Sequence, residues 1–255
     1  MTTAVILAAG RGSRLGRYTR HTPKVLVRAG GRTLLDWHLQ CLHACGIDSI
    51  VVVCGYGIER LERRGVERVR APDWRESGSL DSLFEARPER IEGDVLVLYG
   101  DCPHHPDNVR AVLACDADIA VAGDRDWLRL WRERHAEPLL DAETYRAERG
   151  LLVAIGERAQ RLDDVQAQFA GLLRFTPVGW ASARRIAVCA APAPRDMTGL
   201  LAALLRAGEP VADVPFHGRW CEIDTGADLH LCRRRLHDAQ PWTHDWRIEV
   251  RRQCR

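Results

Sequence analysis

Apolar runs and helix-type stripes alternate along the first half of the chain. Residues 5–7, 49–54 and Asp94–Tyr99 are mainly apolar stretches, as expected for strands that are covered on both faces. Between them, residues 34–42 carry apolar side chains at helical spacing, and residues 79–86 favour a second helix. This alternation predicts an α/β fold in which helices flank a mostly parallel, mixed sheet.

The second half is less regular, and no repeat or Pro/Gly/Ser-rich linker divides the chain. Further helices are expected at residues 58–64, Trp127–Arg134, Met197–Arg206 and 227–236. Further strands are expected at residues 66–70, 119–122, 151–155, Gln168–Phe175, 211–216 and 220–223. We therefore expect a single domain over residues 1–255, ending in a tail (241–255) without a predicted element.

The composition is that of an ordinary globular protein, with 46% hydrophobic residues, 28% charged residues and a net charge of +2. Basic residues are interleaved with Asp and Glu, which argues against a nucleic-acid partner. No apolar run approaches the ~20 residues that cross a bilayer, and no N-terminal targeting signal is expected. The nine cysteines contain no C-x-x-C pair, which favours free thiols and a cytoplasmic location.

The segment after the first strand carries the clearest chemistry. Gly10 and Gly12 let the backbone approach phosphates, while Arg11 and Arg14 add positive charge. Lys24 closes the segment and is the single lysine among 37 Lys and Arg residues. A compact ammonium acts as a point charge on phosphate, whereas arginine needs a planar two-point contact. Lys24 is therefore predicted at the reacting phosphate of a nucleoside triphosphate; an ordinary strand–helix turn is the alternative.

Two carboxylates are expected at neighbouring strand ends. Asp101 follows the strand Asp94–Tyr99, and Asp224 follows the expected strand 220–223. Ligands bind at the carboxyl ends of strands in open α/β sheets, and Mg²⁺ takes few protein oxygens besides water and phosphate. The pair is therefore predicted to bind Mg²⁺, with Glu222 as a further candidate on the strand face of Asp224. A helix N-cap is the alternative for either aspartate alone.

These residues resemble those of the GT-A-like nucleotidyltransferase superfamily, the sugar-nucleotide pyrophosphorylases and their relatives, over nearly the whole chain. The resemblance implies a Rossmann-like, GT-A-type sheet, with residues 1–125 binding the nucleotide and residues 126–240 binding the acceptor. It implies catalytic contacts to the phosphates from Lys24, Arg14 and Arg11, and Mg²⁺ as the cofactor on Asp101 and Asp224. The nucleotide-binding positions it implies are Leu7, Ala8, Ala9, Gly10, Gly12, Ser13, Ser79, Ser82 and Gly100.

Within the superfamily, sugar-phosphate enzymes usually carry a second lysine, which this chain lacks. Residues 126–134, 137–144, 167–172 and 220–224 are instead similar to cytidylyltransferases that act on small phospho- or phosphono-compounds. That branch includes enzymes for phosphocholine, for 2-aminoethylphosphonate in phosphonate biosynthesis, and for L-glutamine phosphate in the phosphoramidate modification of capsule polysaccharide. The resemblance implies transfer of CMP from CTP to such an acceptor, L-glutamine phosphate being favoured, by a monomer or homodimer.

Five residues are expected at the acceptor. Trp127 and Trp131 share one helical face, and one of them is expected to line the pocket, although packing onto the sheet is the alternative. Asp126 and Glu143 could pair with a primary ammonium, and Gly171 could allow the acceptor to approach its strand closely.

Two other functions stay open from the sequence. One is a uridylyl- or thymidylyltransferase acting on a sugar 1-phosphate, if an arginine replaces the missing lysine. The other is a catalytically silent nucleotide-binding protein that regulates a partner, although such a protein would not need Lys24, Asp101 and Asp224 together.

Overall fold

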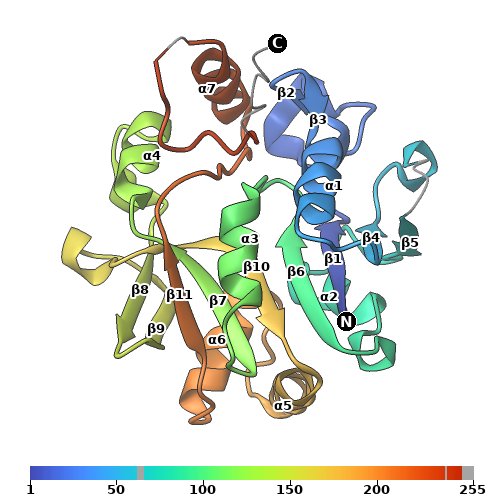
Figure 1. The fold of residues 1–255 in the computed structure, drawn as a ribbon, viewed down its shortest axis with the longest axis vertical. Coiled ribbons are helices and arrows are strands. Elements are labelled where there is room, and N and C mark those ends of the chain that lie inside the picture. The colour runs from blue at the N-terminus through green and yellow to red at the C-terminus, as the bar shows by residue number, and fades with distance from the viewer. Residues whose placement is uncertain (62–65, 239, 249–255) are drawn as a thin grey trace, which may run out of the picture.

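A computed structural model describes residues 1–61, 66–238 and 240–248, and within these ranges its centre is one nine-stranded sheet (Figure 1). In spatial order the strands are β5 (Glu67–Arg70), β4 (Ile50–Cys54), β1 (Thr2–Ala8), β6 (Asp94–Tyr99), β10 (Gln168–Phe175), β7 (Ile119–Asp124), β11 (Ala212–Phe216), β9 (Leu151–Arg158) and β8 (Glu143–Glu148). The pairs β5–β4, β4–β1, β1–β6 and β7–β11 are parallel, whereas β10 runs antiparallel to both of its neighbours. The expected mostly parallel, mixed sheet is therefore confirmed.

Helices cover both faces of the sheet. They are α1 (Leu34–Ala44), α2 (Ser79–Glu85), α3 (Pro106–Leu113), α4 (Trp127–Arg134), α5 (Pro177–Cys189), α6 (Met197–Arg206) and α7 (Gly226–His237). Successive side chains of β1 point to opposite faces, so Ile6 packs in a core with α1, α3, α4 and α7, while Val5 packs in a core with α2, α5 and α6. Figure 1 shows α1 and α3 in front of the sheet. No helix in the described ranges is long and apolar enough to cross a membrane.

Several parts of the fold differ from the sequence prediction. Residues 220–223 form no strand of the sheet: Trp220 makes one isolated bridge to His104, and the Ile223 N–H donates to the Asp101 carbonyl over 3.1 Å. The expected helix 58–64 is a short 3₁₀ turn at Ile58–Arg60, and residues 62–65 lie outside the described ranges. The elements α3, α5 and β8 were not expected. A small two-stranded sheet, β2 (Arg28–Ala29) and β3 (Arg32–Thr33), precedes α1.

The buried carboxylate of Asp124 anchors the end of the chain to the sheet. It accepts hydrogen bonds from Trp220 Nε1 (2.8 Å), His244 Nε2 (3.0 Å) and the Gly218 N–H (2.8 Å). Burial alone would raise the pKa of Asp124, but the His244 imidazole and the other donors hold it below its ordinary 3.8. Part of the expected tail thus belongs to the core, since Trp246 and His244 are also buried; residues 249–255 lie outside the described ranges.

We predict that Asp124→Ala destabilises the protein by about 3–5 kcal/mol, because it leaves buried donors of Trp220 and His244 without their acceptor. Urea unfolding at pH 7 measures the loss, with Asp163→Ala as the control at an exposed aspartate. Since the pKa of Asp124 is lowered by folding, its contribution should be fully present at neutral pH and fade only below about pH 4. Equal midpoints for the two variants would contradict this role.

Candidate active site

The glycine-rich segment turns sharply after β1. Gly12 has a positive φ of 67°, and the Thr19 hydroxyl donates to its carbonyl over 2.8 Å, so the loop folds back on itself before the 3₁₀ turn Ser13–Thr19. A Cβ at Gly12 would lie 2.8 Å from Cδ of Lys24, closer than side chains pack. Glycine is therefore required here for two reasons, the left-handed backbone and the close approach of Lys24.

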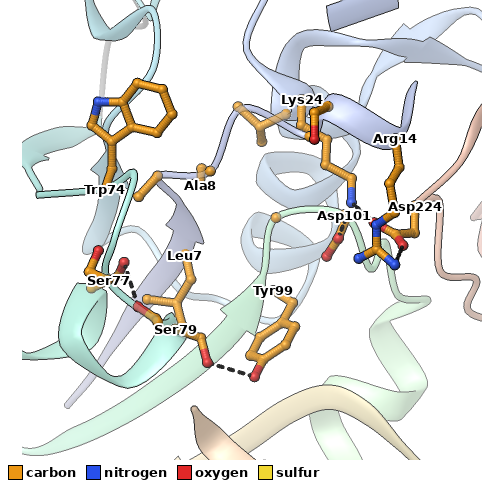
Figure 2. A pocket seen from close by; sticks show the side chains of 18 residues that line it. Leu7, Ala8, Arg14, Lys24, Trp74, Ser77, Ser79, Tyr99, Asp101 and Asp224 are labelled. Atoms are coloured by element: carbon orange, nitrogen blue, oxygen red, sulfur yellow. Dashed lines mark hydrogen bonds and ion pairs between the residues drawn. The ribbon is translucent and has the colours of Figure 1, made fainter. Parts of the chain in front are cut away.

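Lys24 lies beneath this loop and faces two carboxylates. Its Nζ lies 2.5 Å from Oδ2 of Asp101 and 2.7 Å from Oδ1 of Asp224, and 13% of its side chain is exposed. Burial disfavours the ammonium, but the two carboxylates outweigh burial and raise the pKa of Lys24 well above its ordinary value. Arg14 adds a second cation, with Nη1 2.6 Å from Oδ2 of Asp224, on a side chain that is 70% exposed. Figure 2 shows these four side chains converging.

The two aspartates come from distant parts of the chain. Asp101 follows β6 through Gly100, whose N–H donates to the Leu7 carbonyl over 2.9 Å. Asp224 precedes α7. The N–H of the residue before it, Ile223, donates to the Asp101 carbonyl, and this backbone contact holds Asp224 beside the loop after β6. Burial would raise the pKa of Asp101, but the Lys24 ammonium outweighs burial and lowers it, so this carboxylate is charged at neutral pH.

A cavity of about 360 Å³ opens beside Lys24, and we call it the loop cavity. All nine positions that the sequence assigned to nucleotide binding line it, together with Arg14, Lys24, Asp101 and Asp224. The sequence analysis missed Val25, Trp74 and Tyr99, which also line the cavity. Ser77 and Gly78 line it as well, in the segment 77–83 that resembles the base- and ribose-binding helix start of the superfamily. Trp74 lies at the end of the cavity away from Lys24 (Figure 2), where its indole could face a nucleobase. Trp74 lies in a loop, so the sequence around it has no helix or strand periodicity from which its place in the cavity could be predicted.

Arg11 does not lie where the resemblance implied. It is exposed outside the loop cavity, and its guanidinium lies over the Tyr56 ring, 5.4 Å from the centroid. The reason is local: Arg11 precedes the left-handed Gly12, whereas Arg14 lies within the 3₁₀ turn Ser13–Thr19, and only Arg14 contacts Asp224.

A second cavity of about 410 Å³ adjoins the first, and we call it the acceptor cavity. The two cavities share Arg14, Ser79, Tyr99 and Asp224. The expected acceptor residues Trp131, Glu143 and Gly171 line it. Residues that were not expected there are Cys102, Asp141, Gln168, Phe169, Asp196, Thr198 and Trp220.

Asp126 and Trp127 were also expected at the acceptor, but neither lines a cavity beside Lys24. Trp127 is buried and its Nε1 donates to the Val165 carbonyl over 3.1 Å. It therefore packs α4 into the core, which agrees with the packing role that the sequence analysis gave as the alternative. Asp126 precedes α4 and lies 3.5 Å from His217 and 3.9 Å from Arg129. The i,i+4 spacing placed both tryptophans on one face, but only Trp131 reaches the cavity.

The carboxylate oxygens near Lys24 fit a hard divalent cation such as Mg²⁺, but only two of the three candidate carboxylates face the same point. Oxygens of Asp101 and Asp224 converge on one point, where the Lys24 ammonium lies, and two carboxylates suit Mg²⁺, which keeps water and phosphate ligands. Glu222 is turned away toward Arg134, at 2.7 Å, although burial raises the pKa of this carboxyl. No cluster of three or more metal-ligating side chains occurs in the described part of the chain.

The fold and this pair of cavities define a nucleotidyltransferase, and the comparison with known proteins agrees. The chain belongs to the MobA-like NTP transferase domain family, which it matches over residues 4–165. It is 28% identical to the CTP:phosphoglutamine cytidylyltransferase of Campylobacter jejuni over 250 residues, 89% of this chain and 98% of that protein. It is 32% identical to the bifunctional IPC transferase and DIPP synthase of Rubrobacter xylanophilus over 89% of this chain, which spans half of that relative.

Solved structures share the same fold. The inositol-1-phosphate CTP transferase from T. maritima superposes with a TM-score of 0.75 at 20% identity, over 95% of this chain and 98% of that one. Further relatives include the choline-phosphate cytidylyltransferase of Streptococcus pneumoniae, 33% identical over 36% of this chain and 42% of that protein.

We predict that Gly12→Ala weakens nucleoside triphosphate binding at least tenfold, about 1.4 kcal/mol, because the new Cβ displaces Lys24. Gly46→Ala is the matched control: Gly46 also has a positive φ, 75°, but nothing lies within 4 Å of its Cβ position. Both variants should lose about 1 kcal/mol in urea unfolding, and only Gly12→Ala should lose affinity in calorimetric titration. Similar affinities in the two variants would contradict the contact with Lys24.

Proposed function

We propose that this protein transfers CMP from CTP to a small phosphorylated or phosphonylated acceptor and releases pyrophosphate. The observation that supports the reaction most directly is the junction of the two cavities. Arg14, Ser79, Tyr99 and Asp224 line both, and Lys24 lies beside the junction. A nucleotide in the loop cavity and an acceptor in the acceptor cavity would therefore meet at the charged cluster.

The proposed chemistry needs positioning and charge rather than a general base. An acceptor phosphate or phosphonate oxygen is already anionic near neutral pH, so it can attack the α-phosphorus directly. A bond forms between that oxygen and the phosphorus, the bond to the bridging oxygen breaks, and pyrophosphate leaves. Lys24 would stabilise the negative charge on the α-phosphoryl oxygens, and Arg14 the charge on the leaving pyrophosphate.

Mg²⁺ is proposed as the cofactor, held by Asp101 and Asp224, where it would supply positive charge between two anionic reactants. In the free protein Lys24 bridges the same two carboxylates. Its ammonium therefore has to move from between them when a cation binds, and the phosphates of CTP offer it new acceptors. Arg11, exposed and outside the cavity, is left out of this assignment.

The choice of CTP and of acceptor rests on the relatives. A phosphoglutamine, a choline-phosphate and an aminopropylphosphonate enzyme among them use or form cytidine compounds by name. The phosphoglutamine enzyme aligns over 98% of its own length, so L-glutamine phosphate is the acceptor we favour. The lack of a second lysine speaks against a sugar 1-phosphate.

Pyrophosphate release in the presence of Mg²⁺ tests the proposal, with each of four nucleoside triphosphates crossed with an acceptor panel. The panel contains L-glutamine phosphate, phosphocholine, 2-aminoethylphosphonate and glucose 1-phosphate. We predict turnover with CTP and a non-sugar acceptor, and none after chelation of the metal. Turnover only with UTP or dTTP and the sugar phosphate would overturn the substrate assignment, and no turnover at all would favour a silent nucleotide-binding protein.

We also predict that Lys24→Arg lowers kcat roughly 10²–10³-fold, as loss of one preorganised charge contact typically does. A compact ammonium acts as a point charge on the α-phosphoryl oxygens, whereas the planar guanidinium needs a two-point contact, although its charge is the same. Arg132→Ala, at an exposed arginine of α4, is the control. Near-normal turnover of Lys24→Arg, with the fold checked by circular dichroism, would show that any cation suffices and would refute the assigned role.

A further inference from the structure

Charge is distributed unevenly along the acceptor cavity. At the junction with the loop cavity, Asp224 is compensated by Lys24 and Arg14. On the Ser79 side of the cavity, Glu143 begins β8 and Asp196 caps α6. Both residues are exposed, and neither has a basic side chain within ion-pair distance in the described ranges. This side of the cavity therefore has uncompensated negative charge.

The other acids of the cavity are already paired. Asp141 lies 3.2 Å from His135, and Glu222 lies 2.7 Å from Arg134. Glu143 is different: although the residue is exposed, partial burial of its carboxyl and the neighbouring Asp196 and Asp141 raise the pKa of that group, against a smaller lowering by a hydrogen bond from Thr198. Carboxylates that repel one another are stabilised by a cation bound between them.

A buried amide on the same side provides an independent indication of a ligand. Gln168 is 6% exposed and lines the cavity, and its Nε2 donates to the Glu143 carbonyl over 2.9 Å. No donor reaches its Oε1 from the described residues, so this oxygen offers an unused acceptor beside Glu143. Gln168 lines the cavity, where a donor on a bound molecule can reach this oxygen.

We propose that Glu143, Asp196 and Gln168 form a subsite for a primary ammonium group on the acceptor. The inference deepens the proposed function and rests on it: the acceptor would carry its phosphate or phosphonate at the junction and its ammonium on this side. All three side chains present oxygen acceptors to N–H donors. A primary ammonium has three such donors, whereas a quaternary ammonium has none, so the subsite should favour the primary amine.

Two acceptors that differ only in the methyl groups on nitrogen, phosphoethanolamine and phosphocholine, test the subsite. Initial rates of pyrophosphate release from CTP give kcat and KM for each. In the unaltered protein we expect kcat/KM to favour phosphoethanolamine roughly ten- to hundredfold, as expected for hydrogen bonds to charged groups. A preference for phosphocholine would overturn the proposal.

Two substitutions remove charge with little change of shape. Glu143→Gln should raise KM for phosphoethanolamine about tenfold or more while KM for CTP changes less than twofold. Asp196→Asn should act in the same direction, because asparagine retains the N-cap that Asp196 provides to Gly199 (2.7 Å). Glu148→Gln, at an exposed glutamate at the other end of β8, is the matched control.

The outcomes separate the subsite from the proposed function. If CTP turnover is intact but neither Glu143→Gln nor Asp196→Asn reduces the preference for phosphoethanolamine, these carboxylates are a solvated rim and the subsite is refuted. If the unaltered protein releases no pyrophosphate with any acceptor, the proposed function fails. Calorimetric titration with phosphoethanolamine then decides the subsite alone: affinity that is equal in the unaltered protein and Glu143→Gln refutes it.

Discussion

The contact of one buried ammonium with two carboxylates determines the arrangement of the site. Asp101 and Asp224 carry like charges, and close together they would repel one another without a cation between them. Lys24 supplies that cation at 2.5 and 2.7 Å. The glycine loop above it has to leave room for the lysine stem, which explains why residue 12 lacks a side chain. The glycine loop and the two carboxylates are therefore coupled through one residue.

The sheet supplies one of these carboxylates directly and the other indirectly. Parallel pairing of β1 and β6 brings the glycine loop and Asp101 together at the carboxyl ends of these two strands. Asp224 is held at the same place by a buried ion pair. Arg134, which is 2% exposed, pairs with Asp228, and the Asp228 carboxylate accepts from the Asp224 N–H over 3.1 Å. A buried arginine that satisfies several acceptors can fix an irregular segment where no strand ladder is available.

Residues whose position follows from chain order and topology could be predicted from the sequence. The loop, Lys24 and Asp101 follow strands with a strong apolar pattern, and parallel strands end at one edge. Trp74 and Asp196 could not be found this way, because they reach the cavities from irregular segments whose path depends on tertiary packing. The predicted strand 220–223 shows the same limit, since its apolar residues are buried against the loop after β6 rather than in the sheet.

The boundary between the two cavities depends on an irregularity in the sheet. The register of β10 with β7 shifts between Phe169 and Leu173, and Gly171 within this bulge has a φ of 67°. A Cβ there would lie 2.9 Å from Cβ of Tyr99, so glycine lets the Tyr99 ring pack against the bulged strand. The Tyr99 hydroxyl in turn lies 3.0 Å from that of Ser79, and both residues line both cavities. The bulge therefore positions the ring between the two cavities, which is a reason for a bulge to occur in an otherwise regular central strand.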